Sequence, residues 1–174
     1  MAGLANATLR NQLVGSWELI EYCAYLPRDE SDKIYPQGAD ATGIIMYSPD
    51  GYMSAQLQTQ GQKPFVRMEG TEEEWAQAGK SYVAYTGRFF LDEGGDEKGR
   101  PILKHEMRDS NIPFLRGDVQ RRIVKIEQRA GARYLVLSLD EPTQRYGEDR
   151  LIRVTWRRLQ DNQAVSPPEG AGKL

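Results

Sequence analysis

The stretch Gly43-Ile-Ile-Met-Tyr-Ser-Pro-Asp-Gly-Tyr-Met-Ser-Ala-Gln-Leu57 decides the fold. Pro49 presets its own φ angle and Gly51 can adopt a positive φ, so Pro-Asp-Gly reverses the chain tightly. The residues on both sides of this turn are of the types that favour strands. The stretch therefore predicts an antiparallel β-hairpin made of residues 43–48 and 52–58.

Further segments of strand-like composition alternate with turn signals along the rest of the chain. We expect eight strands in all: Ser16 to Tyr25, Gly43 to Ser48, Tyr52 to Gln58, Val83 to Leu91, Ile102 to Asp109, Val119 to Gln128, Arg133 to Leu139, and Leu151 to Leu159. Thr71-Glu-Glu-Glu74 is a capping box and predicts one short helix from about Glu72 to Tyr82, covering an end or a flank. This order favours an all-β protein, an eight-stranded antiparallel up-and-down barrel, because closure removes both sheet edges and leaves room for one small ligand. An open sandwich is the alternative.

Length and charge limit the classes of protein that remain. The chain has 174 residues, with 23 Lys and Arg against 25 Asp and Glu, so its formal charge is 23 − 25 = −2. Nucleic-acid binding is disfavoured, because it usually needs a basic face. No stretch approaches the roughly 18 apolar residues of a membrane span, and the N-terminus has no secretory pattern. We therefore expect a cytoplasmic protein without a nucleic-acid or membrane partner.

The length fits a single domain. We expect an N-terminal extension at residues 1–12, a barrel at 13–159 and a disordered tail at 160–174. The tail has almost nothing large and apolar to bury.

Metal and cofactor chemistry find little support in the sequence. One cysteine, Cys23, excludes an internal disulfide framework, and one histidine, His105, excludes His-rich zinc and di-iron clusters. No glycine-rich phosphate loop opens a helix. We expect no metal and no cofactor.

The first and last strands of the expected barrel carry a known pattern. Gly15-Ser16-Trp17 lies in the first strand, and the last strand holds three arginines, Arg153, Arg157 and Arg158. A Gly-x-Trp in the first strand with a late arginine resembles the lipocalin signature. That resemblance implies that Trp17 plugs one end of the barrel while an arginine packs over its ring.

Longer stretches extend this resemblance. Leu13-Val-Gly-Ser-Trp-Glu-Leu19, the stretch from Gly43 to Leu57, and Tyr82-Val-Ala-Tyr-Thr-Gly-Arg-Phe89 together resemble the lipocalin-like domain family of bacteria and fungi. The resemblance covers about Leu13 to Leu159. Some members of that family lie among genes for natural-product biosynthesis, which implies a polyketide- or terpenoid-like ligand.

His105 is the first candidate for proton transfer, because its unperturbed pKa lies near neutrality. It alternates with Leu103 and Met107 on the more apolar face of its strand, so we expect it in the lumen. A purely structural role, as a neutral imidazole satisfied by hydrogen bonds, is an equal alternative to proton transfer.

Tyr85 could orient a carbonyl or enolate oxygen. Arg121 and its neighbour Arg122 lie on opposite faces, so one points inward unless both are solvated at the rim; we take Arg121, which alternates with Val119 and Ile123, as the inward one.

Other large side chains are candidates for ligand contact in the cavity. They share an apolar or aromatic surface, although filling of the core explains most of them equally well. The candidates are Trp17, Met46, Tyr52, Phe89 and Met107.

Three functional hypotheses follow. The first is a cofactor-independent cyclase, isomerase or dehydratase that acts on a polyketide- or terpenoid-like molecule, with His105, Tyr85 and Arg121 as catalytic groups. The second is a non-catalytic intracellular carrier of an apolar small molecule. The third, weaker hypothesis is an oligomeric interaction module, and the sequence leaves open whether the barrel forms a homodimer.

Overall fold

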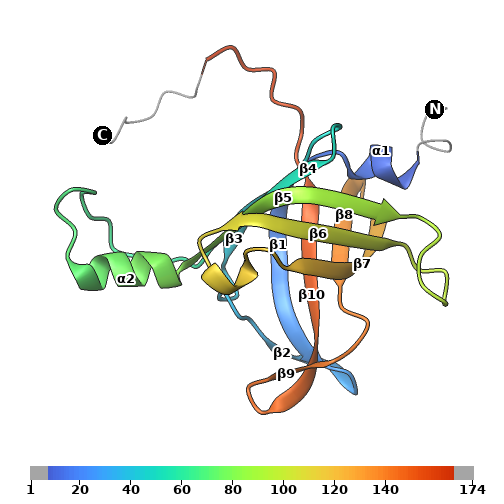
Figure 1. The fold of residues 1–174 in the computed structure, drawn as a ribbon, viewed down its shortest axis with the longest axis horizontal. Helices are drawn as coiled ribbons and strands as arrows, with labels where there is room; N and C mark the ends of the chain where they lie inside the picture. The colour runs from blue at the N-terminus through green and yellow to red at the C-terminus, as the bar shows by residue number, and fades with distance from the viewer. Residues whose placement is uncertain (1–7, 167–174) are drawn as a thin grey trace.

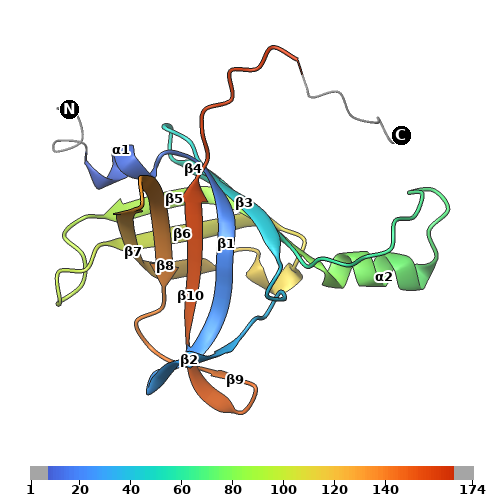
Figure 2. The ribbon, with the colours of Figure 1, turned by 180° about the vertical axis from the view of Figure 1, so that it is seen from behind.

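Antiparallel pairing of neighbouring strands builds a closed barrel in the computed structural model, which describes residues 8–166 (Figures 1 and 2). The elements in chain order are α1 (Leu9–Leu13), β1 (Gly15–Leu26), β2 (Asp29–Ile34), β3 (Thr42–Tyr47), β4 (Tyr52–Gln58), α2 (Glu72–Lys80), β5 (Tyr82–Asp92), β6 (Ile102–Ser110), η1 (Pro113–Leu115), β7 (Val119–Arg129), β8 (Ala132–Ser138), β9 (Thr143–Arg145) and β10 (Glu148–Arg158). The strand order is β2-β1-β3-β4-β5-β6-β7-β8-β10-β9, and β1 also pairs with β10. The expected eight-stranded antiparallel barrel is confirmed, with β2 and β9 as two additional strands.

The β3–β4 hairpin forms where the Pro-Asp-Gly turn predicts it. Gly51 has a φ of +96°, a left-handed conformation that a residue with a Cβ rarely adopts. The Ser48 amide donates to the Tyr52 carbonyl at 2.8 Å, and the Ser48 hydroxyl bonds the Asp50 carboxylate. The strands then pair in register from Tyr47 opposite Met53 down to Thr42 opposite Gln58.

One end of the barrel is sealed around Trp17. Its ring is wholly buried, and its Nε1 donates to the Leu13 carbonyl at 2.9 Å. The Arg158 guanidinium lies 5.2 Å from the Trp17 ring centroid and donates to the Val14 carbonyl. Leu13 at the end of α1 is also wholly buried, so α1 closes this end together with Trp17.

The second helix differs in position from the expectation. The capping box is present: the Thr71 hydroxyl accepts from the Glu74 amide, and the Glu74 carboxylate accepts from the Thr71 amide. However, α2 buries none of its residues and projects away from the barrel (Figures 1 and 2), so it covers neither an end nor a flank. Its Trp75 packs edge-on against Phe65, with centroids 5.0 Å apart.

The two additional strands were not expected because they carry few apolar residues. β2 reads Asp-Glu-Ser-Asp-Lys-Ile and β9 is only three residues long. Within the expected N-terminal extension, residues from Leu9 onward form α1. Residues 160–166 follow β10 without helix or strand, and the remainder of the expected tail, 167–174, lies outside the described residues.

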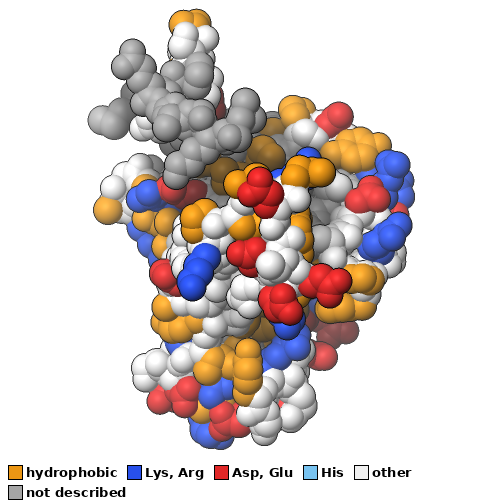
Figure 3. All heavy atoms as spheres, turned by 90° about the vertical axis from the view of Figure 1, so that its left-hand side faces the viewer, with side chains coloured by type: hydrophobic (Ala, Val, Ile, Leu, Met, Phe, Trp, Pro, Cys, Tyr) orange, Lys and Arg blue, Asp and Glu red, His pale blue; other side chains and the backbone are white. Residues whose placement is uncertain are grey.

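The outer surface mixes charges of both signs. On the face drawn in Figure 3, basic and acidic side chains are interspersed with apolar ones, in keeping with the nearly balanced composition. No helix among residues 8–166 is long and apolar enough to cross a membrane.

Gly87 offers a test of the β5–β6 pairing. The register shifts between Thr86 and Gly87, and a Cβ at Gly87 would lie 1.8 Å from the Glu106 carbonyl oxygen and 2.9 Å from the Arg108 amide. Because both contacts are with backbone atoms, relief requires the strands to move apart. We expect Gly87→Ala to lower the free energy of unfolding by about 2 kcal/mol or more, measured by urea denaturation.

Gly79→Ala is the matched control. Gly79 lies in α2, where an added methyl group would meet no atom within 4 Å, and alanine is the better helix former. This variant should keep or slightly raise stability. Equal stabilities for the two variants would contradict the close approach of β5 and β6.

Candidate functional site

The inner face of the barrel carries a polar group in the middle of an apolar core. On β6, Leu103, His105 and Met107 are all buried, which is the face that alternation predicts. Pairing sets His105 between Phe89 on β5 and Gln120 on β7. The polar group is therefore held by three neighbouring strands rather than by a loop.

His105 is paired with a tyrosine in this interior. Its exposed fraction is 1%, and the Tyr47 hydroxyl lies 3.0 Å from its Nε2, within hydrogen-bond distance. Burial, reinforced by the positive charge of Arg122, lowers the pKa of His105 to about 3. Burial also raises the pKa of Tyr47 well above its ordinary value. Both side chains are therefore neutral near pH 7, and each satisfies the other.

Two more tyrosines and an arginine face the same interior. Tyr85 lies beside His105, with ring centroids 6.2 Å apart, and both Tyr85 and Tyr22 pack against the core while remaining partly exposed. Burial raises the pKa of both phenols. The charge of Arg122 opposes that rise for Tyr85, and the charges of Arg145 and Arg122 oppose it for Tyr22. Neither hydroxyl has a hydrogen-bond partner among residues 8–166. This part of the interior thus offers two hydroxyl groups without a partner among the described residues, on side chains that are only partly buried.

Arg122 belongs to this group because of the β6–β7 register. It pairs with Leu103 across the sheet, and Gln120 pairs with His105. The Arg122 guanidinium donates to the Gln120 side-chain oxygen and, at 2.9 Å, to the Arg121 carbonyl. We call Tyr22, Tyr47, Tyr85, His105, Gln120 and Arg122 the interior polar cluster.

The residues expected at the site divide into two sets. Five of them lie on the inner face: His105, Tyr85, Trp17, Phe89 and Met107. Trp17 belongs to the sealed end, and Phe89 contacts the Tyr47 ring edge-on at 5.2 Å between centroids.

The other three expectations are corrected by the structure. Met46 is 43% exposed and Tyr52 49% exposed, because the inner positions of β3 and β4 are the buried Ile45, Tyr47, Met53, Ala55 and Leu57. Arg121 also points outward, where it forms an ion pair with Asp140 at 2.5 Å. The prediction that Met46, Tyr52 and Arg121 lie in the cavity is therefore wrong, because each lies one residue away from an inward position of its strand.

The sequence held a signal for the correct parity of β7. Beyond the two arginines, Val124 and Ile126 alternate with Lys125 and Glu127. The apolar pair shares its face with Arg122, and the charged pair shares the opposite face with Arg121. Tyr47 and Tyr22 were missed for a different reason, since nothing local distinguishes an inward tyrosine from an outward one.

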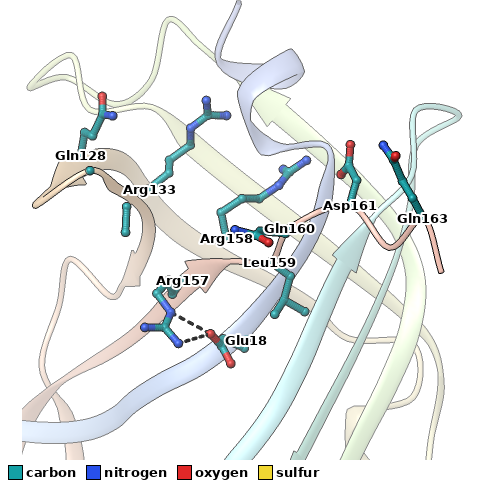
Figure 4. Close-up of a pocket in the computed structure, with 11 residues that line it drawn as sticks. Glu18, Gln128, Arg133, Arg157, Arg158, Leu159, Gln160, Asp161 and Gln163 are labelled. Carbon is teal, nitrogen blue, oxygen red and sulfur yellow. Dashed lines mark hydrogen bonds and ion pairs between the residues drawn. The ribbon is translucent and has the colours of Figure 1, made fainter. Parts of the chain in front are cut away.

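An open groove of about 980 Å³ lies elsewhere, outside the sealed end (Figure 4). Its walls are charged and polar, with Arg133, Arg158 and Asp161 among them. Figure 4 shows Glu18 and Arg157 forming an ion pair across part of its floor. We assign the candidate site to the interior polar cluster instead, because there the Tyr22 and Tyr85 hydroxyls have no partner among residues 8–166 and pack against the apolar core, where the charge of Arg122 reaches both. No group of three or more His, Cys, Asp or Glu within residues 8–166 could hold a metal ion.

Comparison with known proteins agrees with this geometry. A closed antiparallel barrel with a Trp17–Arg158 plug at one end is the architecture of a lipocalin-type protein, and residues 14–159 match the family model described as the lipocalin-like domain. The chain belongs to that family. It is also similar to the 4'-hydroxy-3'-methoxypropiophenone carrier protein ppsC of Aspergillus oryzae, with 34% identity over 111 residues, which cover 62% of this chain and 96% of that protein.

The low pKa of His105 predicts a pH-dependent stability. Unfolding returns the imidazole to an ordinary pKa near 6.5, so below pH 6.5 the unfolded state binds a proton that the folded state excludes until about pH 3. Stability therefore falls as the pH falls through this window. From pH 6.5 to 5.0 we expect His105 to contribute a loss of about 1.5 kcal/mol in the free energy of unfolding.

Urea denaturation at several pH values checks this, with His105→Gln as the comparison. His105 is the sole histidine of the chain, so the variant has no side chain whose ordinary pKa lies between pH 6.5 and 5.0. Its free energy of unfolding should change by less than that of the wild type between pH 6.5 and 5.0. Parallel pH profiles for the two proteins would show that His105 is not held neutral by burial.

Proposed function

We propose that the protein is a carrier that binds one small aromatic ketone or phenol inside the barrel. The observation that carries this proposal is the interior polar cluster, in which the partly exposed residues Tyr22 and Tyr85 present hydroxyl groups without a partner among residues 8–166, beside the apolar core. A ligand with an aromatic body and one or two oxygens matches such a surface, because apolar burial supplies affinity and the hydroxyls fix orientation.

The related Aspergillus protein supports the same class of ligand. Its name specifies a carrier of 4'-hydroxy-3'-methoxypropiophenone, an aryl ketone with a phenolic hydroxyl. The match covers 96% of that protein, so the whole carrier is comparable with this chain. We infer a ligand of similar size and oxygen pattern for the present barrel.

Proton chemistry is less well supported than carriage. A general acid or base works best with a pKa near the operating pH, whereas the pKa of His105 falls to about 3 and that of Tyr47 rises. Both groups are suited to hydrogen bonding and poorly suited to exchanging protons near pH 7. This reverses the order of the first two of the three hypotheses drawn from the sequence, and the cyclase, isomerase or dehydratase becomes the alternative. The cytoplasmic location remains a prediction from the sequence.

Binding of 4'-hydroxy-3'-methoxypropiophenone tests the proposal. Native mass spectrometry should show one ligand per barrel, and chromatography after long incubation should recover the ligand unchanged. Conversion by the wild type that disappears in His105→Ala would establish the enzyme instead. Absence of binding by both this ketone and a panel of related phenols would overturn the carrier.

A pair of tyrosine variants locates the site. Tyr85→Phe removes an inward hydroxyl and should weaken binding about three- to tenfold, the worth of one neutral hydrogen bond. Tyr52→Phe removes an exposed hydroxyl on the outer face and should leave the dissociation constant unchanged. Isothermal titration calorimetry measures both. Equal effects of the two changes would place the ligand outside the barrel.

A further inference from the structure

Arg122 presents a positive charge to the barrel interior without an acidic partner. Its guanidinium bonds only neutral oxygens, those of the Gln120 side chain and the Arg121 backbone. Among residues 8–166, no carboxylate lies within ion-pair distance of it. The neighbouring Arg121, by contrast, is paired with Asp140.

The groups that face Arg122 do not neutralise it. From β1, β3, β5 and β6 these are Tyr22, Tyr47, Tyr85 and His105, whose pKa values are shifted in the directions that keep each of them uncharged. The nearby acids of β6 and β7 lie on the outer face, where they are already paired. Glu106 bonds Arg88, and Glu127 bonds Lys125 and Arg129.

An uncompensated cation in an apolar enclosure costs free energy of folding, because it loses hydration without gaining a counter-charge. The enclosure of Arg122 is incomplete, since its side chain is partly exposed. A bound molecule that displaces this remaining water must supply an oxygen that the guanidinium can bond. An anionic oxygen suits that position better than a neutral one, because it adds the Coulomb attraction of an opposite charge to the hydrogen bond.

Resting on the carrier function proposed above, we propose that the barrel selects organic monoanions. The ligand's negatively charged oxygen, as a carboxylate, enolate or phenolate, lies against Arg122, and its aromatic body lies along the apolar wall. Tyr22 and Tyr85 donate hydrogen bonds to the same oxygen or to a neighbouring one. The phenol of an aryl ketone would then bind most tightly above its own pKa.

Two fluorescent probes of nearly equal shape test this directly. 1-Anilinonaphthalene-8-sulfonate is an anion, and N-phenyl-1-naphthylamine is the same ring system without the sulfonate. Each is titrated into wild type, Arg122→Gln and the matched control Arg121→Gln. In Arg122→Gln the anion should bind at least about tenfold more weakly, while the neutral probe changes less than about twofold. Arg121→Gln should bind both probes like the wild type.

The outcomes separate the two proposals. If 4'-hydroxy-3'-methoxypropiophenone displaces both probes but Arg122→Gln weakens both equally, the carrier stands and the selection of anions is overturned. If neither probe binds the wild type, and the ketone does not bind by mass spectrometry, the carrier itself fails. Arg122→Lys, which keeps the charge, should restore part of the preference for the anion, and failure to do so would contradict a charge effect.

Folding of the variants is checked by thermal unfolding. Because Arg122 has no acidic partner among the described residues, Arg122→Gln should melt at or above the temperature of the wild type. Arg121→Gln loses an exposed ion pair with Asp140 and should change the melting temperature little. A large destabilisation of Arg122→Gln would show that the cation is already compensated in the free protein and would overturn the proposal.

Discussion

Pairing of β1 with β10 is the constraint on which the rest of the structure depends. It closes the sheet, so alternate side chains of every barrel strand are enclosed and two open edges disappear. Trp17 and Arg158 stand opposite each other at the end of this seam, and their stacking seals the barrel where the pairing ends. Once the sheet is closed, the environment of an inner side chain is fixed by its parity alone. Tyr47 and His105 meet only because β3 and β6 face each other across that enclosed space.

How much could be read from the sequence depended on whether the signal was local. The β3–β4 hairpin follows from Pro49 and Gly51, and the start of α2 follows from its capping box, because both are set by residues adjacent in the chain. The polar strand β2 could not be found in this way, since it is held by pairing with β1 rather than by an apolar face of its own. The inward position of Arg122 is an intermediate case, because the local sequence holds the signal only further along the strand. Reading β7 only up to Ile123 gives the wrong parity, whereas the alternation from Val124 onward gives the right one.

The polar groups of the interior fall into two energetic kinds. Tyr47 and His105 satisfy each other at 3.0 Å and are neutral, so they can be wholly buried at little cost. The acceptors of Arg122 within the described part of the chain are all neutral, and the side chain is partly exposed. The same contrast separates other polar groups. At the sealed end, Trp17 and Arg158 donate to backbone carbonyls, whereas the hydroxyls of Tyr22 and Tyr85 have no partner among the described residues. A protein selected for stability alone would gain from apolar side chains at those positions.

A carrier and a cofactor-independent enzyme can share one barrel, and what separates them is whether an enclosed group exchanges a proton near neutral pH. Burial moves the pKa of His105 down to about 3 and that of Tyr47 and Tyr85 upward, which is away from neutrality in each case. The positive charge of Arg122 strengthens the first shift and only partly offsets the others. The interior is thus a set of neutral groups close to the Arg122 cation, with the charge of Arg145 also acting on Tyr22. In such a site the ionisation state that changes near neutral pH would belong to the bound molecule, which is why we propose a barrel that distinguishes ligands by charge and leaves their bonds intact.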